Sequence, residues 1–510
     1  MYKKELERVS PESVGIPSEK VLNMIRRMEE SVREMHGIMV ARNGKVISEC
    51  WWAPYDKDVV HICHSFGKSY SCTGIALAVT DGLLSEDDLI IDIFKDEIKE
   101  YGVTVTDNLR KLKVRHVLSM TNGMSKMAMG GPNFVKNYLT AEVDQEPGSA
   151  WLYNTTGSCL LVAIVEKVAG MGIREYLTPR VFNKIGIETD KLGWQKFRDG
   201  GTYATTGVSS TTENNLRLGM LFLNLGIWDG EQILDHDFLE RATSKQADNS
   251  SLANGPATRD PNSVSGYGYQ LWINKVPGVY RFEGGHGQFS IMSKKNNIVV
   301  STNSSSIHDC DMNAIINLVD ELCDCDYPDE LPENEEACSA LREFEKSRKI
   351  PAPDKAPIPD NYKSWEGIYE VTDGGFHLNP ELRPFHSFNA YCVDFYPRDN
   401  VDAKTLSLRF LSKDRCEMVL DGRFRFIVRM DGVIEQVNTG SDYTSYYTTF
   451  SNGVLSGDTF EIHTRYMQTA FQAIMWITKT DTGVKIKVQK EMLHEGNMYF
   501  YLNAEAKKIL

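Results

Sequence analysis

Hydrophobic and polar positions divide this chain into two regions with different periodicity. In the first region apolar residues recur at helical spacing, most clearly within 18–35 at Val21, Leu22, Ile25 and Met28. From Lys363 onward apolar and polar residues alternate instead, as Leu406, Leu408 and Phe410 do. Alternation is typical of strands that bury one face. The chain is therefore predicted to contain a mixed domain followed by an all-β domain.

Within the first region, 37–41 and 45–47 are apolar runs joined by Arg42-Asn43-Gly44. Asn-Gly between two such runs predicts a hairpin, because both turn positions require positive φ. Further strands are expected at 266–273, 278–282, 289–293 and 298–302. Helices are expected at 71–84, 114–120, 160–169, 211–225 and 311–322. This order predicts an α+β domain whose antiparallel sheet is assembled from both ends of the region, flanked by helices.

The composition changes between the two regions. Six of the 18 prolines fall within 326–361, beside an acidic run at 329–336. We therefore predict a domain at 1–325, a proline-rich acidic linker at 326–361 and a second domain at 362–510. Roughly eight alternating strands in this last part favour an antiparallel barrel or sandwich.

Charge and apolar content exclude several classes of partner. The net charge of −14 argues against nucleic acid or an anionic membrane surface. The charged N-terminal residues are followed by no apolar signal region, and no apolar run reaches the roughly 20 residues that span a bilayer. The ten cysteines are expected to be free thiols in a cytoplasmic protein. Cys310, Cys323, Cys325 and Cys338 lack histidines at ligand spacing, so we expect no metal and no cofactor.

The strongest candidate for chemistry is Ser65-Phe66-Gly67-Lys68, at the start of the apolar helix. Residues three apart share a helix face, so the hydroxyl of Ser65 and the amine of Lys68 are expected side by side. A serine hydroxyl needs a neighbouring base, and a lysine becomes one when burial lowers its pKa. The N–H groups at the start of the helix would face a developing oxyanion.

Two further segments carry groups suited to the same chemistry. Tyr153 lies in the loop 147–157 before an apolar helix, where it is a candidate proton carrier or a packing aromatic. Between two predicted strands, Gly284, Gly285 and Gly287 allow a close approach of the backbone to a ligand. A strand N–H in this stretch would donate to an oxyanion, unless the glycines form an edge bulge.

In their order along the chain, these three segments resemble the serine β-lactamase and penicillin-binding-protein superfamily, specifically its class C-like hydrolase branch. The resemblance covers roughly 11–321 and is supported by 114–124 and 207–226. It implies that Ser65 is the acylated nucleophile, Lys68 its partner base and Tyr153 the tyrosine of the Tyr-x-Asn motif. It also implies that the N–H groups of Ser65 and Gly285 form the oxyanion hole. The second domain resembles the lipocalin-like barrels attached to some members.

The chain departs from this family at two motif positions. The third residue of the tyrosine motif is Thr155 rather than Asn, and the Lys of the Lys-Thr-Gly strand motif is Phe282, in Phe282-Glu283-Gly284. By the resemblance, Thr155, Phe282, Gly284 and His286 are expected to contact substrate. For His286, pairing with a neighbouring group is an equal alternative. Where Arg281 points is left open.

The resemblance implies a serine hydrolase that acts on a small ester, amide or peptide. The glycine-rich form around His286 is similar to esterase members and to 6-aminohexanoate-dimer hydrolases. Two alternatives stay open, namely a D-amino-acid peptidase or β-lactamase, and a non-catalytic scaffold. Whether Lys68 or Tyr153 is the acylation base also stays open. The second domain is expected to shape the active-site mouth or to mediate assembly into a homo-oligomer.

Overall fold

The hairpin predicted at Asn43-Gly44 lies at one edge of a six-stranded sheet. The computed structural model describes residues 5–128, 133–196, 202–250, 260–306, 309–378, 402–439, 448–491 and 499–510. Strands β1 (Met35–Arg42) and β2 (Lys45–Trp51) pair in antiparallel fashion. Asn43 and Gly44 have φ values of 52° and 78°, the left-handed turn that this dipeptide favours. The prediction of a hairpin is confirmed.

The sheet draws its strands from both ends of the region, as expected. Its order is β2-β1-β11-β10-β9-β8, with antiparallel neighbours throughout. The other four strands are β8 (Trp272–Ile273), β9 (Val279–Gly284), β10 (Gln288–Ser293) and β11 (Ile298–Ser304). The strand predicted at 266–273 shortens to two residues, because Gln270 adopts a φ of 60° and its N–H bonds to the carbonyl of Leu118.

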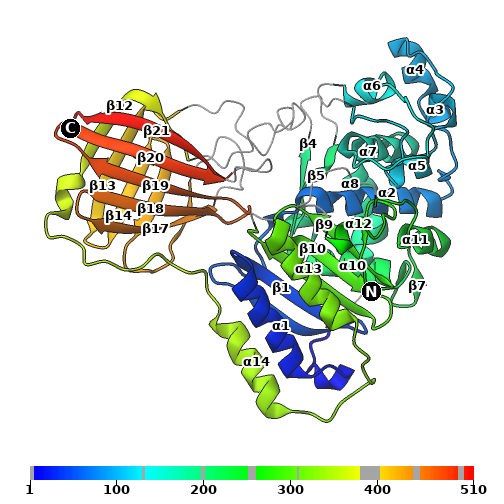
Figure 1. Cartoon of the computed structure of the whole chain (residues 1–510), viewed down its shortest axis with the longest axis horizontal. Helices are drawn as coiled ribbons and strands as arrows, with labels where there is room; N and C mark the ends of the chain where they lie inside the picture. Colours follow the sequence, from blue (N-terminus) through cyan, green and yellow to red (C-terminus); the bar gives the residue numbers. More distant parts are fainter. Residues whose placement is uncertain are drawn as a thin grey trace. The chain divides into compact units, whose positions relative to one another are not determined.

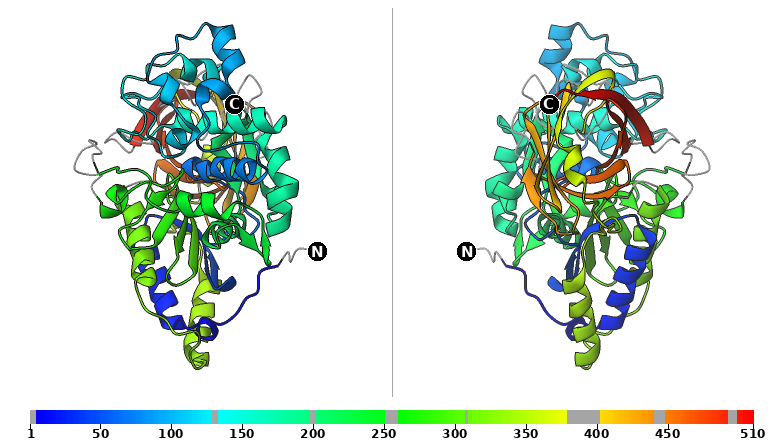
Figure 2. Two further views of the ribbon diagram at one scale, coloured as in Figure 1. Left: turned by 90° about the vertical axis from the view of Figure 1, so that its right-hand side faces the viewer. Right: turned by 90° about the vertical axis from the view of Figure 1, so that its left-hand side faces the viewer.

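Helices cover both faces of this sheet (Figures 1 and 2). On one face α1 (Ser18–Ser31), α13 (Asp309–Cys323) and α14 (Glu335–Ser347) pack together. On the other face α10 (Thr212–Leu223) lies so close that a Cβ on Gly219 would come 3.0 Å from the side chain of Val299. The sheet therefore lies between two helical layers, as expected for an α+β domain.

Beyond α10, a helical subdomain surrounds α2 (Gly67–Thr80). From Gly67 to Ala78 every residue of α2 is buried, consistent with a sequence that is apolar or small on all sides. The other helices are α3 (Ile90–Ile93), α4 (Lys95–Tyr101), α5 (Val114–Leu118), α6 (Phe134–Leu139), α7 (Thr155–Ala169), α8 (Ile173–Leu177), α9 (Asn183–Ile185), α11 (His236–Ala242) and α12 (Pro261–Val264). The small strands are β3 (His61–Ile62), β4 (Gly193–Lys196), β5 (Thr202–Ser210), β6 (Ile227–Trp228) and β7 (Glu231–Gln232).

The segment expected to be a linker is partly folded. Within 326–361, α14 packs on α1 and β2 through the buried side chains of Leu341 and Phe344. Arg342 also donates to the carbonyl of Ile47 at 2.9 Å. The chain divides into two compact units at 349/350, so α14 belongs to the first unit and only the later prolines follow the boundary.

The second unit is a closed antiparallel barrel (Figure 1). Its strands are β12 (Gly367–Gly375), β13 (Thr405–Ser412), β14 (Arg415–Leu420), β15 (Phe424–Arg429), β16 (Gln436–Asn438), β17 (Thr448–Ser456), β18 (Thr459–Tyr466), β19 (Gln472–Lys479), β20 (Gly483–Glu491) and β21 (Tyr499–Lys508). A short parallel contact between β15 and β17 closes the ring, and β16 pairs only with β17. Along β20, Ile486 is buried while Lys485 and Lys487 are exposed, the alternation that predicted a barrel.

Two properties of the whole chain can be compared with expectation. The eight cysteines with described environments are free thiols, as expected. Among the described helices, none is by itself long and apolar enough to cross a membrane, and only the bent pair Thr155–Ala169 and Ile173–Ile185 passes that test jointly.

Candidate active site

Ser65 lies in a tight turn between a short strand and the buried helix. Strand β3 pairs with β5, and the N–H of Cys63 donates to the carbonyl of Val208 at 2.8 Å. The turn that follows is a 3-10 helix, His64–Phe66, which leads directly into α2. His64 has a φ of 50°, an uncommon conformation for a residue with a side chain and one that clusters at functional sites. Ser65 therefore lies in a 3-10 turn directly before the α-helix, near the helix start where the sequence placed it.

Lys68 projects from the first turn of α2 onto Ser65. Its Nζ donates to the Ser65 Oγ at 3.0 Å, and the residue is only 1% exposed. Burial lowers the pKa of Lys68 from its usual value to about 7, although the nearby thiol of Cys159 opposes this shift. In the described part of the chain Lys68 forms no ion pair. Near neutral pH the amine therefore exists partly as a free base.

Tyr153 lies close to both Lys68 and Ser65. Asn154 caps α7 by accepting a hydrogen bond from the Gly157 N–H at 2.8 Å, which fixes the loop just before the helix. The Lys68 Nζ lies 4.9 Å from the centroid of the Tyr153 ring. Burial raises the pKa of Tyr153, against a hydrogen bond with Ser65, so the phenol stays protonated. Thr155, the first residue of α7, is half-buried.

The end of strand β9 runs against the turn that carries Ser65. A Cβ on Gly284 would lie 2.0 Å from the carbonyl oxygen of Cys63 and 3.0 Å from the backbone nitrogen of Phe66. Only glycine allows this approach, and Gly285 is the next residue along the chain. The predicted partnership of Ser65 and Gly285 as N–H donors is therefore sterically reasonable.

His286 and Phe282, two predicted substrate contacts, are held by neighbours. The Nδ1 of His286 bonds the carbonyl of Ser306 at 2.8 Å, and its ring lies 5.2 Å from that of His64. Phe282 is 1% exposed and packs edge-on against Phe66 and Phe222. The expectation that Phe282 contacts substrate is therefore corrected, because alternation along β9 directs its apolar ring into the core.

The side chains on either side of Phe282 lie on the opposite face of β9. Arg281 is 1% exposed, and its Nε donates to an oxygen of Glu283 at 2.6 Å. Its Nη1 donates to Asn262 and Asn274, at 3.0 and 2.7 Å. Arg281 therefore points into the protein, toward Glu283, Asn262 and Asn274.

Sequence reasoning missed an aromatic cluster beside Tyr153. Trp272 from β8 stacks on Tyr153 with ring centroids 5.8 Å apart and an interplanar angle of 20°. Trp151 lies 5.7 Å from Trp272, and Tyr267 lies 5.2 Å from it. The position of Trp151, two residues before Tyr153, was the one signal in the sequence. Trp272 and Tyr267 are far from Tyr153 in the sequence, and only the fold brings these rings together.

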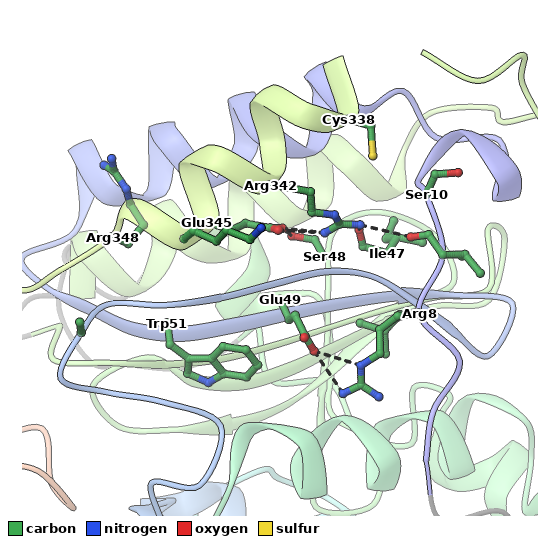
Figure 3. Close-up of a pocket in the computed structure, with 14 residues that line it drawn as sticks. Arg8, Ser10, Ile47, Ser48, Glu49, Trp51, Cys338, Arg342, Glu345 and Arg348 are labelled. Atoms are coloured by element: carbon green, nitrogen blue, oxygen red, sulfur yellow. Dashed lines mark hydrogen bonds and ion pairs between the residues drawn. The ribbon is translucent and has the colours of Figure 1, made fainter. Parts of the chain in front are cut away.

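A separate pocket of about 640 Å³ lies between β2 and α14 (Figure 3). The buried charge in this pocket is the carboxylate of Glu345. It accepts hydrogen bonds from Ser48 and Arg342, and the arginine balances its charge. Burial raises the pKa of Glu345. Ser65, Lys68 and Tyr153 do not line this pocket. It is therefore distinct from the candidate active site.

One group of metal-ligand types gathers within the described residues. His236, Asp237 and Glu240 lie together at the surface of α11, and all three are exposed. Exposed acidic groups of this kind are common without a metal, so we assign no function to this cluster.

The chain resembles known proteins in its sequence and in its fold. The Beta-lactamase family model matches residues 24–314. An uncharacterized protein of Alkalihalophilus pseudofirmus is 24% identical over 45% of this chain and 70% of its own length. Penicillin-binding protein 4* of Bacillus subtilis is 25% identical over 25% of this chain and 29% of its own length. An octameric penicillin-binding protein homologue from Pyrococcus abyssi, 15% identical, aligns over 96% of this chain and 99% of its own, with a TM-score of 0.45.

The family model spans more than half of the chain and includes all three predicted motif segments. The resemblance seen in the motifs is therefore confirmed at the level of the superfamily. The chain belongs to the Beta-lactamase family.

Proposed function

We propose that this protein hydrolyses small esters or amides through an acyl-enzyme formed on Ser65. The observation that carries the proposal is the contact between Lys68 and Ser65. A buried amine whose pKa is about 7 lies 3.0 Å from a hydroxyl that precedes a helix, beside a protonated tyrosine. A nucleophile, a base that is free at neutral pH and a proton donor thus occur together.

In the first half of the reaction the Ser65 Oγ attacks the substrate carbonyl carbon. Its proton passes to the neutral Nζ of Lys68, and the carbonyl oxygen becomes an oxyanion. The N–H groups of Ser65 and Gly285 would donate to that oxyanion. We assign Lys68 rather than Tyr153 as the acylation base, because burial lowers the pKa of the amine and raises that of the phenol.

Collapse of the tetrahedral intermediate breaks the bond to the leaving group. Tyr153 gives its proton to the departing oxygen or nitrogen, and the Lys68 ammonium replaces that proton. Water then attacks the acyl-enzyme, Lys68 again takes a proton, and the acid product leaves as Ser65 recovers its hydrogen. Protons and electron pairs balance without any cofactor.

A β-lactamase or D-amino-acid carboxypeptidase is the second candidate, and the geometry gives it less support. The resemblance places a cation for the substrate carboxylate at the position of Phe282, whose ring is in the core. The nearest cation on the same strand, Arg281, is buried and bonded to Glu283, Asn262 and Asn274. The proximity of Ser65, Lys68 and Tyr153 also argues against a non-catalytic scaffold.

The test is turnover of p-nitrophenyl acetate, p-nitrophenyl butyrate and a chromogenic cephalosporin. We expect ester turnover that Ser65→Ala reduces by about three orders of magnitude or more. The matched control, Ser71→Ala, removes a buried serine hydroxyl further along the same helix and should keep the activity. Ester turnover that survives in Ser65→Ala would contradict the proposal, and efficient cephalosporin turnover would favour the second candidate.

A further inference from the structure

A carboxylate directly follows the position at which the resemblance places a cation for an acidic substrate. Glu283 lies on β9 two residues before Gly285, and its side chain is 20% exposed. It directly precedes Gly284, the residue at which β9 meets the backbone of Cys63 and Phe66 on either side of Ser65. Its negative charge also contributes to the raised pKa values of Tyr153 and Tyr267. The carboxylate therefore belongs to the surroundings of the nucleophile.

Only one oxygen of this carboxylate is engaged. Oε2 accepts the hydrogen bond from the Arg281 Nε at 2.6 Å. Oε1 accepts no hydrogen bond from any residue that the structure describes. Since Arg281 is 1% exposed and Glu283 is 20% exposed, a bound molecule meets the carboxylate and not the guanidinium.

An aromatic side chain contacts the arginine that binds this carboxylate. The Arg281 Cζ lies 5.6 Å from the centroid of the Trp272 ring, and Trp272 in turn stacks on Tyr153. Both Tyr153 and Trp272 are partly exposed. The Arg281 guanidinium and the Lys68 Nζ already lie over these two rings, so the attraction for a further cation comes from the partly exposed Glu283 carboxylate. The arrangement favours an ammonium group and disfavours a carboxylate.

We propose that Glu283 selects substrates that carry a positively charged ammonium group. This inference rests on the proposed hydrolase function and names its substrate class, cationic esters or amides. Glu283 acts as a specificity residue that binds the charged part of the substrate, while Ser65 and Lys68 carry out the reaction.

The experiment compares esters that differ only in charge. In the leaving-group pair, butyrylthiocholine is matched by 3,3-dimethylbutyl thiobutyrate, in which carbon replaces nitrogen. In the acyl pair, p-nitrophenyl 4-(trimethylammonio)butyrate is matched by p-nitrophenyl 5,5-dimethylhexanoate. The readout is the ratio of kcat/KM for the cationic ester to that for the neutral one. We expect this ratio to be about 10 or more in at least one pair.

Glu283→Gln should reduce that ratio to about 1 or below, because it removes the negative charge but keeps the size of the side chain. The ratio is taken within each variant, so a general loss of activity cancels. Glu343→Gln, which removes an exposed carboxylate from α14, should leave the ratio unchanged. If Glu283→Gln does not fold, the fall of the wild-type ratio between about 0.02 and 0.5 M NaCl replaces it, since salt screens exposed charges.

Two results would overturn this inference while leaving the hydrolase function intact. One is turnover of the neutral esters with a ratio of 1 or less in both pairs. The other is a high ratio that Glu283→Gln does not change. If none of the four esters is hydrolysed, the proposed function itself is contradicted.

Discussion

At the scale of single residues, the proposed mechanism depends on the burial of Lys68, which lowers the pKa of its amine. A lysine that is 1% exposed and forms no ion pair with the described residues is destabilised in its charged form. The same desolvation that costs folding free energy supplies a base at neutral pH. Function and stability are therefore expected to oppose each other at this residue.

The first prediction at this scale concerns the pH dependence of activity. Below the Lys68 pKa of about 7 the amine is protonated and cannot take the proton of Ser65. The value of kcat/KM for a neutral ester should therefore fall about tenfold per pH unit below that value. The measurement is a pH profile between pH 4.5 and 9. An acid limb centred near pH 4 would instead indicate a carboxylate base.

The second prediction concerns stability, and it uses Lys68→Met. Between pH 7 and 10.5 the unfolded chain holds a proton on this lysine that the folded chain has lost, so folding stability rises with pH across this window. Removing the amine should abolish activity and raise the free energy of unfolding by a few kcal/mol, on the order of 1.4 kcal/mol per pKa unit, at pH 7.

That gain should shrink toward pH 10.5, as urea denaturation at several pH values would show. Lys95→Met, on the exposed surface of α4, serves as the control and should give no comparable gain. A Lys68→Met protein no more stable than the wild type would argue against a neutral, desolvated amine.

At the scale of elements, the site depends on how closely β9 approaches the turn that carries Ser65. A Cβ on Gly284 would clash with backbone atoms of Cys63 and Phe66. Backbone atoms cannot move aside as easily as the end of a side chain. Gly284→Ala should therefore push the strand end away and misplace the N–H of Gly285. We expect a loss of at least about tenfold in kcat and a destabilisation of about 1–3 kcal/mol.

The control for this variant is Gly172→Ala at the start of α8. A Cβ there would meet nothing closer than 3.9 Å, and the backbone adopts an ordinary negative φ. This variant should change neither activity nor stability appreciably. Full activity in Gly284→Ala would show that the close approach of β9 is not required.

The elements also show which features a sequence reveals. The hairpin at Asn43-Gly44 and the apolar helix predicted at 160–169 depend on neighbouring residues, so local pattern predicted them, although the helix begins earlier, at Thr155, with Asn154 as its cap. Phe282 is buried because the sheet turns its face of β9 toward α10, where Phe222 packs on it. The position of Phe282 in the motif did not predict this burial. Glu283 pairs with Arg281, two residues earlier on the same strand, whereas the stacking of Trp272 on Tyr153 joins β8 to a loop far away in the sequence.

At the scale of the whole molecule, alternation predicted the strands of the second unit but not their closure. Closure depends on the parallel contact of β15 with β17, which joins residues far apart in the ladder. Proline content also suggested a linker where α14 in fact packs on the first unit. The expected roles of the barrel, shaping the active-site mouth or mediating assembly, stay predictions.

The central claim is that Ser65 becomes covalently acylated. The most direct measurement is intact mass spectrometry with peptide mapping after brief reaction with p-nitrophenyl butyrate at pH 8 and acid quenching. A fluorophosphonate probe can trap the same nucleophile when deacylation is fast. The account predicts one adduct, located on Ser65, present in the wild type and in Ser71→Ala but absent in Ser65→Ala. An adduct on another residue, or undiminished labelling of Ser65→Ala, would contradict it.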